Sequence, residues 1–147
     1  MSETINEKRK WLPALPELID RLSIVTLKSI KLEHKEYYEK EAEELMHDIH
    51  LILKEDITKI QHYGKLVRAI QIGCLANEII WSNETKARLG EGTQDHLLPL
   101  THSINGLRMT AGNAISNQTG TKKDLNVDRL NKELCKKFGY DFSGLFE

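Results

Sequence analysis

Residues 17–63 contain neither glycine nor proline, and this uninterrupted stretch constrains the fold more than any other feature of the chain. Leu, Ile, Lys and Glu fill much of it, and these residues are compatible with helix. A single helix over this span would be about 70 Å long at ~1.5 Å per residue, which is too long for a compact domain of this size. We therefore predict two helices, over residues 16–34 and 41–61, with a turn near Tyr37 and Tyr38.

The rest of the chain also has the pattern of helices separated by polar or glycine-containing loops. A third helix is predicted over residues 65–89, and its apolar residues from Val67 to Trp81 cover nearly the whole circumference, which is typical of a central helix. A fourth begins near Pro99, a polar loop covers 117–124, and a short last helix covers 127–137. The expected fold is an all-α, single-domain helical bundle over residues 1–147, with four main helices and a short C-terminal helix.

The two ends of the chain and the second helix have less central roles in this prediction. The helix over 41–61 is amphipathic and should be peripheral, and residues 1–12 form a flexible N-terminus. Residues 138–147 hold all three phenylalanines of the chain. Such an aromatic tail must dock, either on its own bundle or on a neighbouring subunit, because exposed apolar patches favour association.

Charge and composition exclude several classes of protein. The chain has 21 Lys and Arg against 22 Asp and Glu, a net charge of -1, which argues against nucleic-acid binding and does not oppose self-association. No apolar run approaches the ~20 residues of a membrane span, and residues 1–10 lack the apolar segment of a secretory signal. Cys74 and Cys135 form no CxxC pair, so we expect reduced thiols in a cytoplasmic protein, with Cys74 in the core.

Two helices carry motifs that resemble a known group of proteins. The first contains Glu17-Leu-Ile-Asp-Arg-Leu-Ser-Ile24, and the third contains the pattern N-x-x-I-W-x-x-E-x-x-x-R. The chain therefore resembles a family of uncharacterised bacterial and phage all-helical proteins that pair an LIDRLxI first helix with an NxxLWxxExxxR later helix. The resemblance covers about a third of the chain, implies a helical fold and assigns no chemistry.

The third helix places polar residues on a stripe that begins apolar. At ~100° per residue, the apolar residues Leu66 and Ile70 and the polar residues that follow them lie on one side of the helix. The candidate ligand-binding residues on or beside this stripe are Asn77, Trp81, Glu84 and Arg88. The stripe is either a buried hydrogen-bond network that includes an i,i+4 pair between Glu84 and Arg88, or a polar pocket beside Trp81.

Two further charges occupy positions where a hydrophobic residue is expected. Arg108 lies near the apolar line of the fourth helix, and Asp20 lies among apolar residues of the first. One explanation is mutual neutralisation among Asp20, Glu84, Arg88 and Arg108, because an unpaired buried ion costs several kcal/mol. The other is a site for a small anion, since guanidinium groups bind phosphate and carboxylate well.

Acidic spacing offers a weaker hypothesis of metal-dependent chemistry. Glu17 and Asp20, and likewise Glu41 and Glu44, have the i,i+3 spacing with which all-α nucleotide pyrophosphohydrolases hold Mg²⁺. About three such pairs are expected by chance among 22 acidic residues, so this spacing has little weight. No catalytic residue, metal site or cofactor is predicted.

These patterns lead to a ranked functional expectation. The first is a homo-oligomeric binding protein for a small anionic ligand, such as a nucleotide or sugar phosphate, without catalysis. The alternative is a protein–protein interaction module with a purely structural polar core. A metal-dependent nucleotide pyrophosphohydrolase-like enzyme is third.

Overall fold

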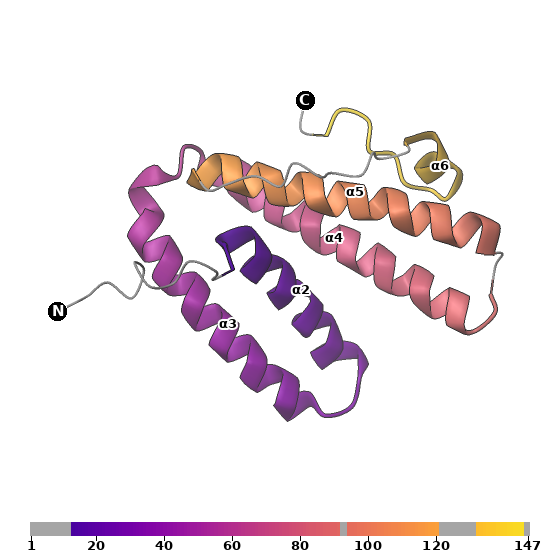
Figure 1. The fold of residues 1–147 in the computed structure, drawn as a ribbon, viewed down its shortest axis with the longest axis horizontal. Helices are drawn as coiled ribbons and strands as arrows, with labels where there is room; N and C mark the ends of the chain where they lie inside the picture. Colours follow the sequence, from indigo (N-terminus) through magenta and orange to yellow (C-terminus); the bar gives the residue numbers. More distant parts are fainter. Residues whose placement is uncertain (1–12, 92–93, 121–131, 146–147) are drawn as a thin grey trace.

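The computed structural model describes residues 13–91, 94–120 and 132–145, and the regular structure in these ranges is helical. In chain order the helices are α2 (Leu15–Lys31), α3 (Lys35–Asp56), a 3-10 turn η1 (Ile57–Lys59), α4 (Tyr63–Arg88), α5 (Gln94–Thr119) and α6 (Lys132–Lys137). Figure 1 shows two helical hairpins, α2–α3 and α4–α5, with α6 beside α5 on the side away from α2. The predicted all-α bundle is confirmed. None of the described helices is long and apolar enough to cross a membrane.

The turn of the first hairpin lies earlier than predicted. α2 ends where Leu32 takes an extended conformation, and His34 adopts φ +65° immediately before α3 begins. Tyr37 and Tyr38 therefore belong to α3. The reason is that Tyr38 packs against the core of the hairpin, with the ammonium group of Lys28 5.9 Å from the centre of its ring.

Local capping explains how α4 begins and ends. The ring nitrogen Nδ1 of His62 accepts the backbone N–H of Lys65 at 3.0 Å, which satisfies one of the free donors of the first turn. At the other end Gly90 has φ +73°, and the N–H of Glu91 donates to the carbonyl of Lys86 at 2.8 Å. This is the hydrogen bonding of a Schellman motif, in which glycine avoids the steric cost of positive φ.

The fourth helix is longer than predicted at both ends. α5 begins at Gln94, so Pro99 lies inside it, and it ends at Thr119, so part of the expected polar loop is helical. Leu97 and Leu100 on either side of the proline are buried, as is Thr119, whose hydroxyl donates to the carbonyl of Ile115. Burial of these side chains explains why the helix extends beyond the bounds that proline and the polar residues predict. Of the predicted last helix, residues 127–131 lie outside the described residues.

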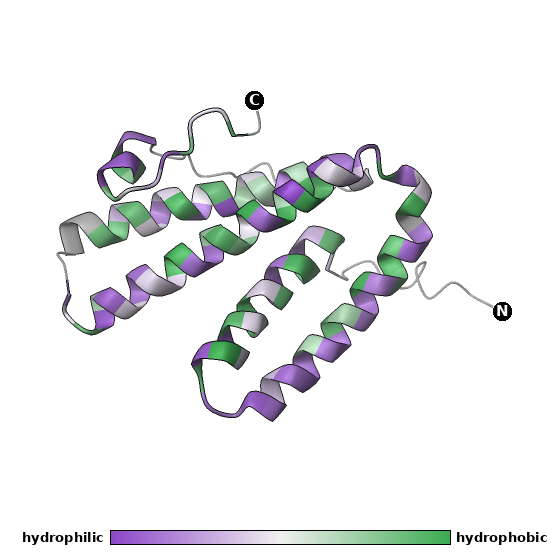
Figure 2. Ribbon diagram, turned by 180° about the vertical axis from the view of Figure 1, so that it is seen from behind, coloured by the Kyte–Doolittle hydropathy of each residue, from purple (hydrophilic) through white to green (hydrophobic). Residues whose placement is uncertain are grey.

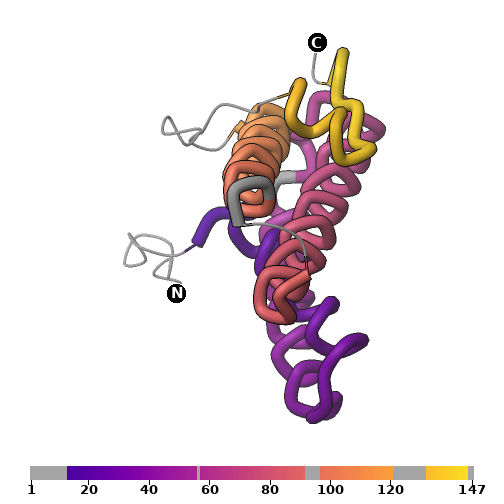
Figure 3. The backbone as a smooth tube through the Cα atoms, turned by 90° about the vertical axis from the view of Figure 1, so that its right-hand side faces the viewer, coloured from indigo at the N-terminus to yellow at the C-terminus, as the bar shows by residue number. Residues whose placement is uncertain are grey.

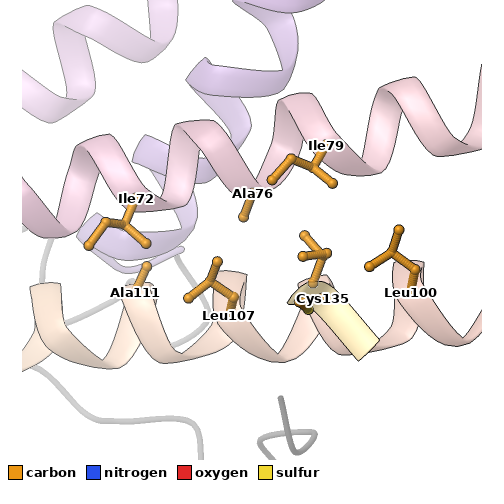
Figure 4. Close-up of a cluster of buried hydrophobic side chains, with 8 residues drawn as sticks. Ile72, Ala76, Ile79, Leu100, Leu107, Ala111 and Cys135 are labelled. Atoms are coloured by element: carbon orange, nitrogen blue, oxygen red, sulfur yellow. The ribbon is translucent and has the colours of Figure 1, made fainter. Parts of the chain in front are cut away.

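The main core is the seam between α4 and α5. It is closed by Cys135 of α6, whose side chain is fully buried and whose thiol pKa is raised by that burial. Figure 4 shows residues of α4 and α5 facing one another along the seam, with Cys135 beside them. The buried members are Ile72, Ala76, Ile79, Leu100, Ile104, Leu107, Ala111 and Cys135.

α4 is central but is not buried on all sides, which corrects the prediction from its composition. α5 and α2 contact two of its sides and leave a third side open. Val67 and Leu75 on that side are 53% and 59% exposed. Cys74, predicted to lie in the core, is exposed, whereas Cys135 is the buried thiol.

α2 connects the two hairpins. Leu18 and Val25 pack against Ala42 and Leu45 of α3, while residues on another side of α2 reach α4 and α5. α3 is peripheral, as predicted, and Figure 2 shows hydrophilic residues over much of it. The side view in Figure 3 places the turn of the first hairpin at the opposite end of the molecule from α6.

The aromatic tail folds back on its own bundle. Tyr140 and Phe142 stack with ring centres 6.1 Å apart, and both pack with Leu145 against the α4–α5 seam. A second Schellman motif aims the tail there, because Gly139 has φ +91° and the N–H of Tyr140 donates to the carbonyl of Cys135 at 2.9 Å. Of the two predicted dockings, the described residues adopt the intramolecular one.

Candidate functional site

The polar side chains singled out by the sequence gather where α2, α4 and α5 meet. The carboxylate of Asp20 accepts two hydrogen bonds from Arg108, one from Nε at 2.7 Å and one from Nη2. This is a bidentate, charge-assisted pair, the strongest class of side-chain hydrogen bond. It joins α2 to α5 across 88 positions of sequence.

Asn77 of α4 completes the connection. Its Nδ2 donates to Oδ1 of Asp20 at 2.9 Å and to the hydroxyl oxygen of Ser23 at 3.1 Å, and the residue is only 4% exposed. Arg108 also donates from Nη1 to Oδ1 of Asn105, at a longer 3.4 Å. We call Asp20, Ser23, Asn77, Asn105 and Arg108 the junction network.

Close helix packing one turn away from these residues explains why they meet. Gly112, one turn beyond Arg108 on α5, lies where an added Cβ would be 3.8 Å from Cβ of Pro16, which is one turn before Asp20. An added Cβ on Gly73, one turn before Asn77, would lie 3.6 Å from Cβ of Ala111. The three helices are therefore in close contact at these positions, and i,i+4 spacing then places the polar side chains one turn away near one another.

The junction network is electrically compensated but not sealed from water. The hydrogen bond from Asp20 raises the pKa of Arg108 above its ordinary value, burial opposes this, and the negative charges of Asp20 and Glu84 add to the increase. The side chains of Arg108 and Asp20 remain 32% and 29% exposed. One arginine thus faces two carboxylates, which disfavours binding of an anion at this point.

The remaining predicted site residues do not join the junction network. Arg88 is exposed and donates to the hydroxyl of Thr85 at 3.3 Å, and Glu84 is exposed. The predicted Glu84–Arg88 pair is not among the ion pairs formed within the described part of the chain. Trp81 is half-buried on the same side of α4 as Asn77.

Three polar residues were missed by the sequence interpretation. Ser23 and Asn105 lie three positions from Asp20 and Arg108, on the same helix faces, and this spacing is the signal that would have identified them. Asn83 is 4% exposed on the α5-facing side of α4, and its Nδ2 has no hydrogen-bond partner within the described residues. In the sequence, Asn83 could have been recognised as a polar residue at helical spacing from the apolar residues Ile72, Ala76 and Ile79.

We expect Asn83→Leu to raise the free energy of unfolding by about 1 kcal/mol, because it removes a buried donor without a partner and adds apolar contact in the seam. Asn77→Leu is the matched control, since Asn77 is equally buried but makes two hydrogen bonds. It should lower stability by about 2 kcal/mol. Urea denaturation of both variants measures the difference, and two changes of the same sign would contradict this assignment.

The two acidic pairs do not form a set. α2 and α3 run in opposite directions, and Glu17 and Asp20 lie in the first two turns of α2 whereas Glu41 and Glu44 lie in the first half of α3, so the two pairs are offset along the hairpin. Asp20 is moreover engaged by Arg108. In the described ranges, no three His, Cys, Asp or Glu residues are arranged to hold a metal ion.

Comparison of the chain with protein-family models, with curated proteins and with solved structures gives no significant match. Any functional assignment therefore depends on the residues themselves.

Proposed function

We propose that this protein is a helical interaction module, which binds other polypeptide chains through its outer helix faces and uses the junction network to fix its two hairpins. The observation that carries the proposal is the bidentate Asp20–Arg108 pair. It pairs Arg108, the partly buried arginine of the predicted site, with a carboxylate of the same chain. Asn77 likewise donates its two amide hydrogens to groups of the same chain, the carboxylate of Asp20 and the hydroxyl of Ser23.

The outer faces of the helices supply the surface that such a module needs. Large apolar side chains are exposed on every long helix, although single exposed residues are common and only contiguous sets favour docking. The most exposed are Ile30 at 73%, Tyr37 at 69%, Leu98 at 68%, Leu89 at 67% and Leu75 at 59%. Two free thiols, Cys74 and Cys135, support a reducing compartment such as the cytoplasm as the site of action.

A thermal-shift screen with nucleotides and sugar phosphates tests the proposal. We expect no ligand to raise the melting temperature by more than about 1 °C, because a ligand at 100 times its dissociation constant would stabilise the protein by about 2.7 kcal/mol, a shift of several degrees. Stabilisation by a phosphate compound that disappears in Asn105→Ala would contradict the interaction module. The result that would support the interaction module is chemical cross-linking of the protein to partner proteins through lysines of α2 and α3.

Binding of a small ligand is the second candidate, and one observation favours it. Arg108 and Asp20 are each about a third exposed, and Trp81 of α4 and Asn105 of α5 are partly exposed as well. A ligand reaching Arg108 would have to share it with Asp20, so a polar ligand of low charge fits better than a phosphate. Quenching of Trp81 fluorescence on titration, lost in Arg108→Met, is the result that would favour this candidate.

A further inference from the structure

Residues 132–145 form a small unit that lies on the α4–α5 seam, and we call this segment the latch. It consists of α6 and the turns that follow it. Hydrogen bonds within the segment shape its backbone, since the N–H of Tyr140 donates to the carbonyl of Cys135 at 2.9 Å. The carboxylate of Asp141 likewise accepts the N–H of Ser143 at 3.0 Å. The latch therefore has a local structure of its own.

Apolar side chains attach the latch to the bundle. Of its residues only Cys135 is buried, with 0% of its surface exposed. Figure 4 shows this side chain between Leu107 and Leu100 along the seam. The other apolar residues of the latch that pack against the seam are only partly buried, and they are Leu134, Tyr140, Phe142 and Leu145. One small side chain is thus the deepest contact of the latch.

The rest of the core does not depend on the latch. The other two buried clusters of the described chain consist of residues between Leu15 and Ile115. Within the seam itself, Leu107 of α5 packs with Ile72 and Ala76 of α4. The junction network lies wholly within α2, α4 and α5. A segment that shares few buried contacts with the remainder of a protein can open as a unit without global unfolding.

The length of α6 couples its folding to its docking. The helix has six residues, which is shorter than the roughly 12 to 15 residues that an isolated helix needs to be stable in water. The latch should therefore lose its helix when it leaves the seam. Opening also removes Cys135 from its place beside Leu100, which is 1% exposed while the latch is closed. Part of the apolar seam then becomes accessible to solvent.

We propose that the latch opens as a unit while α2 to α5 remain folded, and that it acts as a conformational switch which covers or uncovers the apolar seam. This goes beyond the proposed interaction function, which uses the outer helix faces, because the seam is a surface that the closed state hides. The thiol of Cys135 reports the state of the switch. Its burial raises its pKa and keeps it inert while the latch is closed, and opening brings it into solvent.

The rate at which Cys135 reacts with dithiobis(nitrobenzoic acid) tests the proposal. The full chain would carry Cys74→Ser, which leaves Cys135 as its single thiol. At low urea concentrations the rate should depend only weakly on urea, because opening of the latch exposes far less surface than global unfolding. A rate as steeply dependent on urea as global unfolding, measured by circular dichroism, would contradict a separate opening. A rate equal to that of free cysteine would contradict the closed state.

Two glycine variants separate opening of the latch from global unfolding. Gly139 has φ +91° and an added Cβ would meet nothing within 4 Å, so Gly139→Ala strains only the backbone of the latch. It should raise the reaction rate of Cys135 about tenfold. Gly90→Ala is the matched control, because Gly90 has φ +73° and equally open surroundings but lies at the end of α4.

Both glycine variants should lower the stability of the whole chain to a similar degree, because both strain the native backbone. Only Gly139→Ala should accelerate the reaction of Cys135, since Gly90→Ala strains the closed and the open state alike. Equal acceleration in the two variants would show that Cys135 is reached only by global unfolding, and this result would overturn the proposal.

Alkylation with N-ethylmaleimide supplies a readout of the seam itself. An adduct on Cys135 does not fit the close-packed site that the thiol fills, so the alkylated chain carrying Cys74→Ser should be held open. We expect this chain to bind an anilinonaphthalene sulfonate dye and to keep nearly all its helicity, because α6 has only six residues. Loss of most helicity would show that the latch is not separable. Absence of dye binding would show that its opening does not uncover the seam.

Discussion

Arg108→Ala should lower the free energy of unfolding by about 3 kcal/mol. The substitution leaves the Asp20 carboxylate at the meeting point of three helices without its bidentate partner, while Asn77 supplies only one hydrogen bond to it. The expected loss is at the lower end of the range for buried pairs because both side chains are about a third exposed, so water replaces part of the interaction. Urea denaturation at neutral pH measures it.

Arg88→Ala is the control for this prediction. Arg88 is exposed and makes a single long hydrogen bond to Thr85, so its loss should cost less than about 0.5 kcal/mol. In a double-mutant cycle with Asp20→Ala, the combined loss should be smaller than the sum of the two single losses. Equal costs for Arg88→Ala and Arg108→Ala, or strict additivity in the cycle, would show that the junction network does not hold the hairpins.

Leu107→Ala should have an effect at least as large, lowering the free energy of unfolding by about 3 to 4 kcal/mol. Leu107 is 1% exposed and lies in the seam between Ile72 and Ala76 of α4 and the segment that carries Cys135. Figure 4 shows it pointing toward α4. Truncation removes transfer free energy and leaves a cavity that rigid neighbouring helices cannot fill.

Leu98→Ala on the same helix is the matched control. Leu98 is 68% exposed, so the same chemical change should alter stability by less than about 0.5 kcal/mol. Thermal denaturation of the two variants under one set of conditions separates burial from helix propensity, because both positions exchange leucine for alanine within α5. A comparable loss at both positions would mean that the seam does not dominate the stability of the fold.

Local sequence signals were sufficient to predict where the helices lie, but not which of their sides are exposed. The Gly-free and Pro-free stretch and the glycine after α4 predict helices close to the observed ones, because capping and propensity act over a few residues. α4 reads as apolar all round, yet Cys74 and Leu75 are exposed. Which of several apolar sides is covered depends on how many other helices pack against the helix. The hydrophobic periodicity of the helix itself does not give that number.

The candidate site was predictable to a similar extent. Helical spacing identified Asp20 and Arg108 as charges out of place and suggested that they neutralise each other, which the structure bears out for this pair. Spacing also suggested that Arg88 belongs with them, but it lies on the exposed part of α4. The difference arises because α2 reaches the middle of α4 at Asn77 and Glu78, and no periodic pattern specifies where two helices make contact.

The burial of Cys135 against residues 72–111 has a consequence for how the chain is made. During synthesis the α2–α3 hairpin forms from neighbouring segments and can assemble as soon as it emerges from the ribosome. The α4–α5 seam, in contrast, stays partly uncovered until Cys135, Tyr140 and Phe142 have left the ribosome. A nascent chain therefore exposes an apolar surface to chaperones until that segment emerges, and a chain truncated before Cys135 would keep this surface exposed.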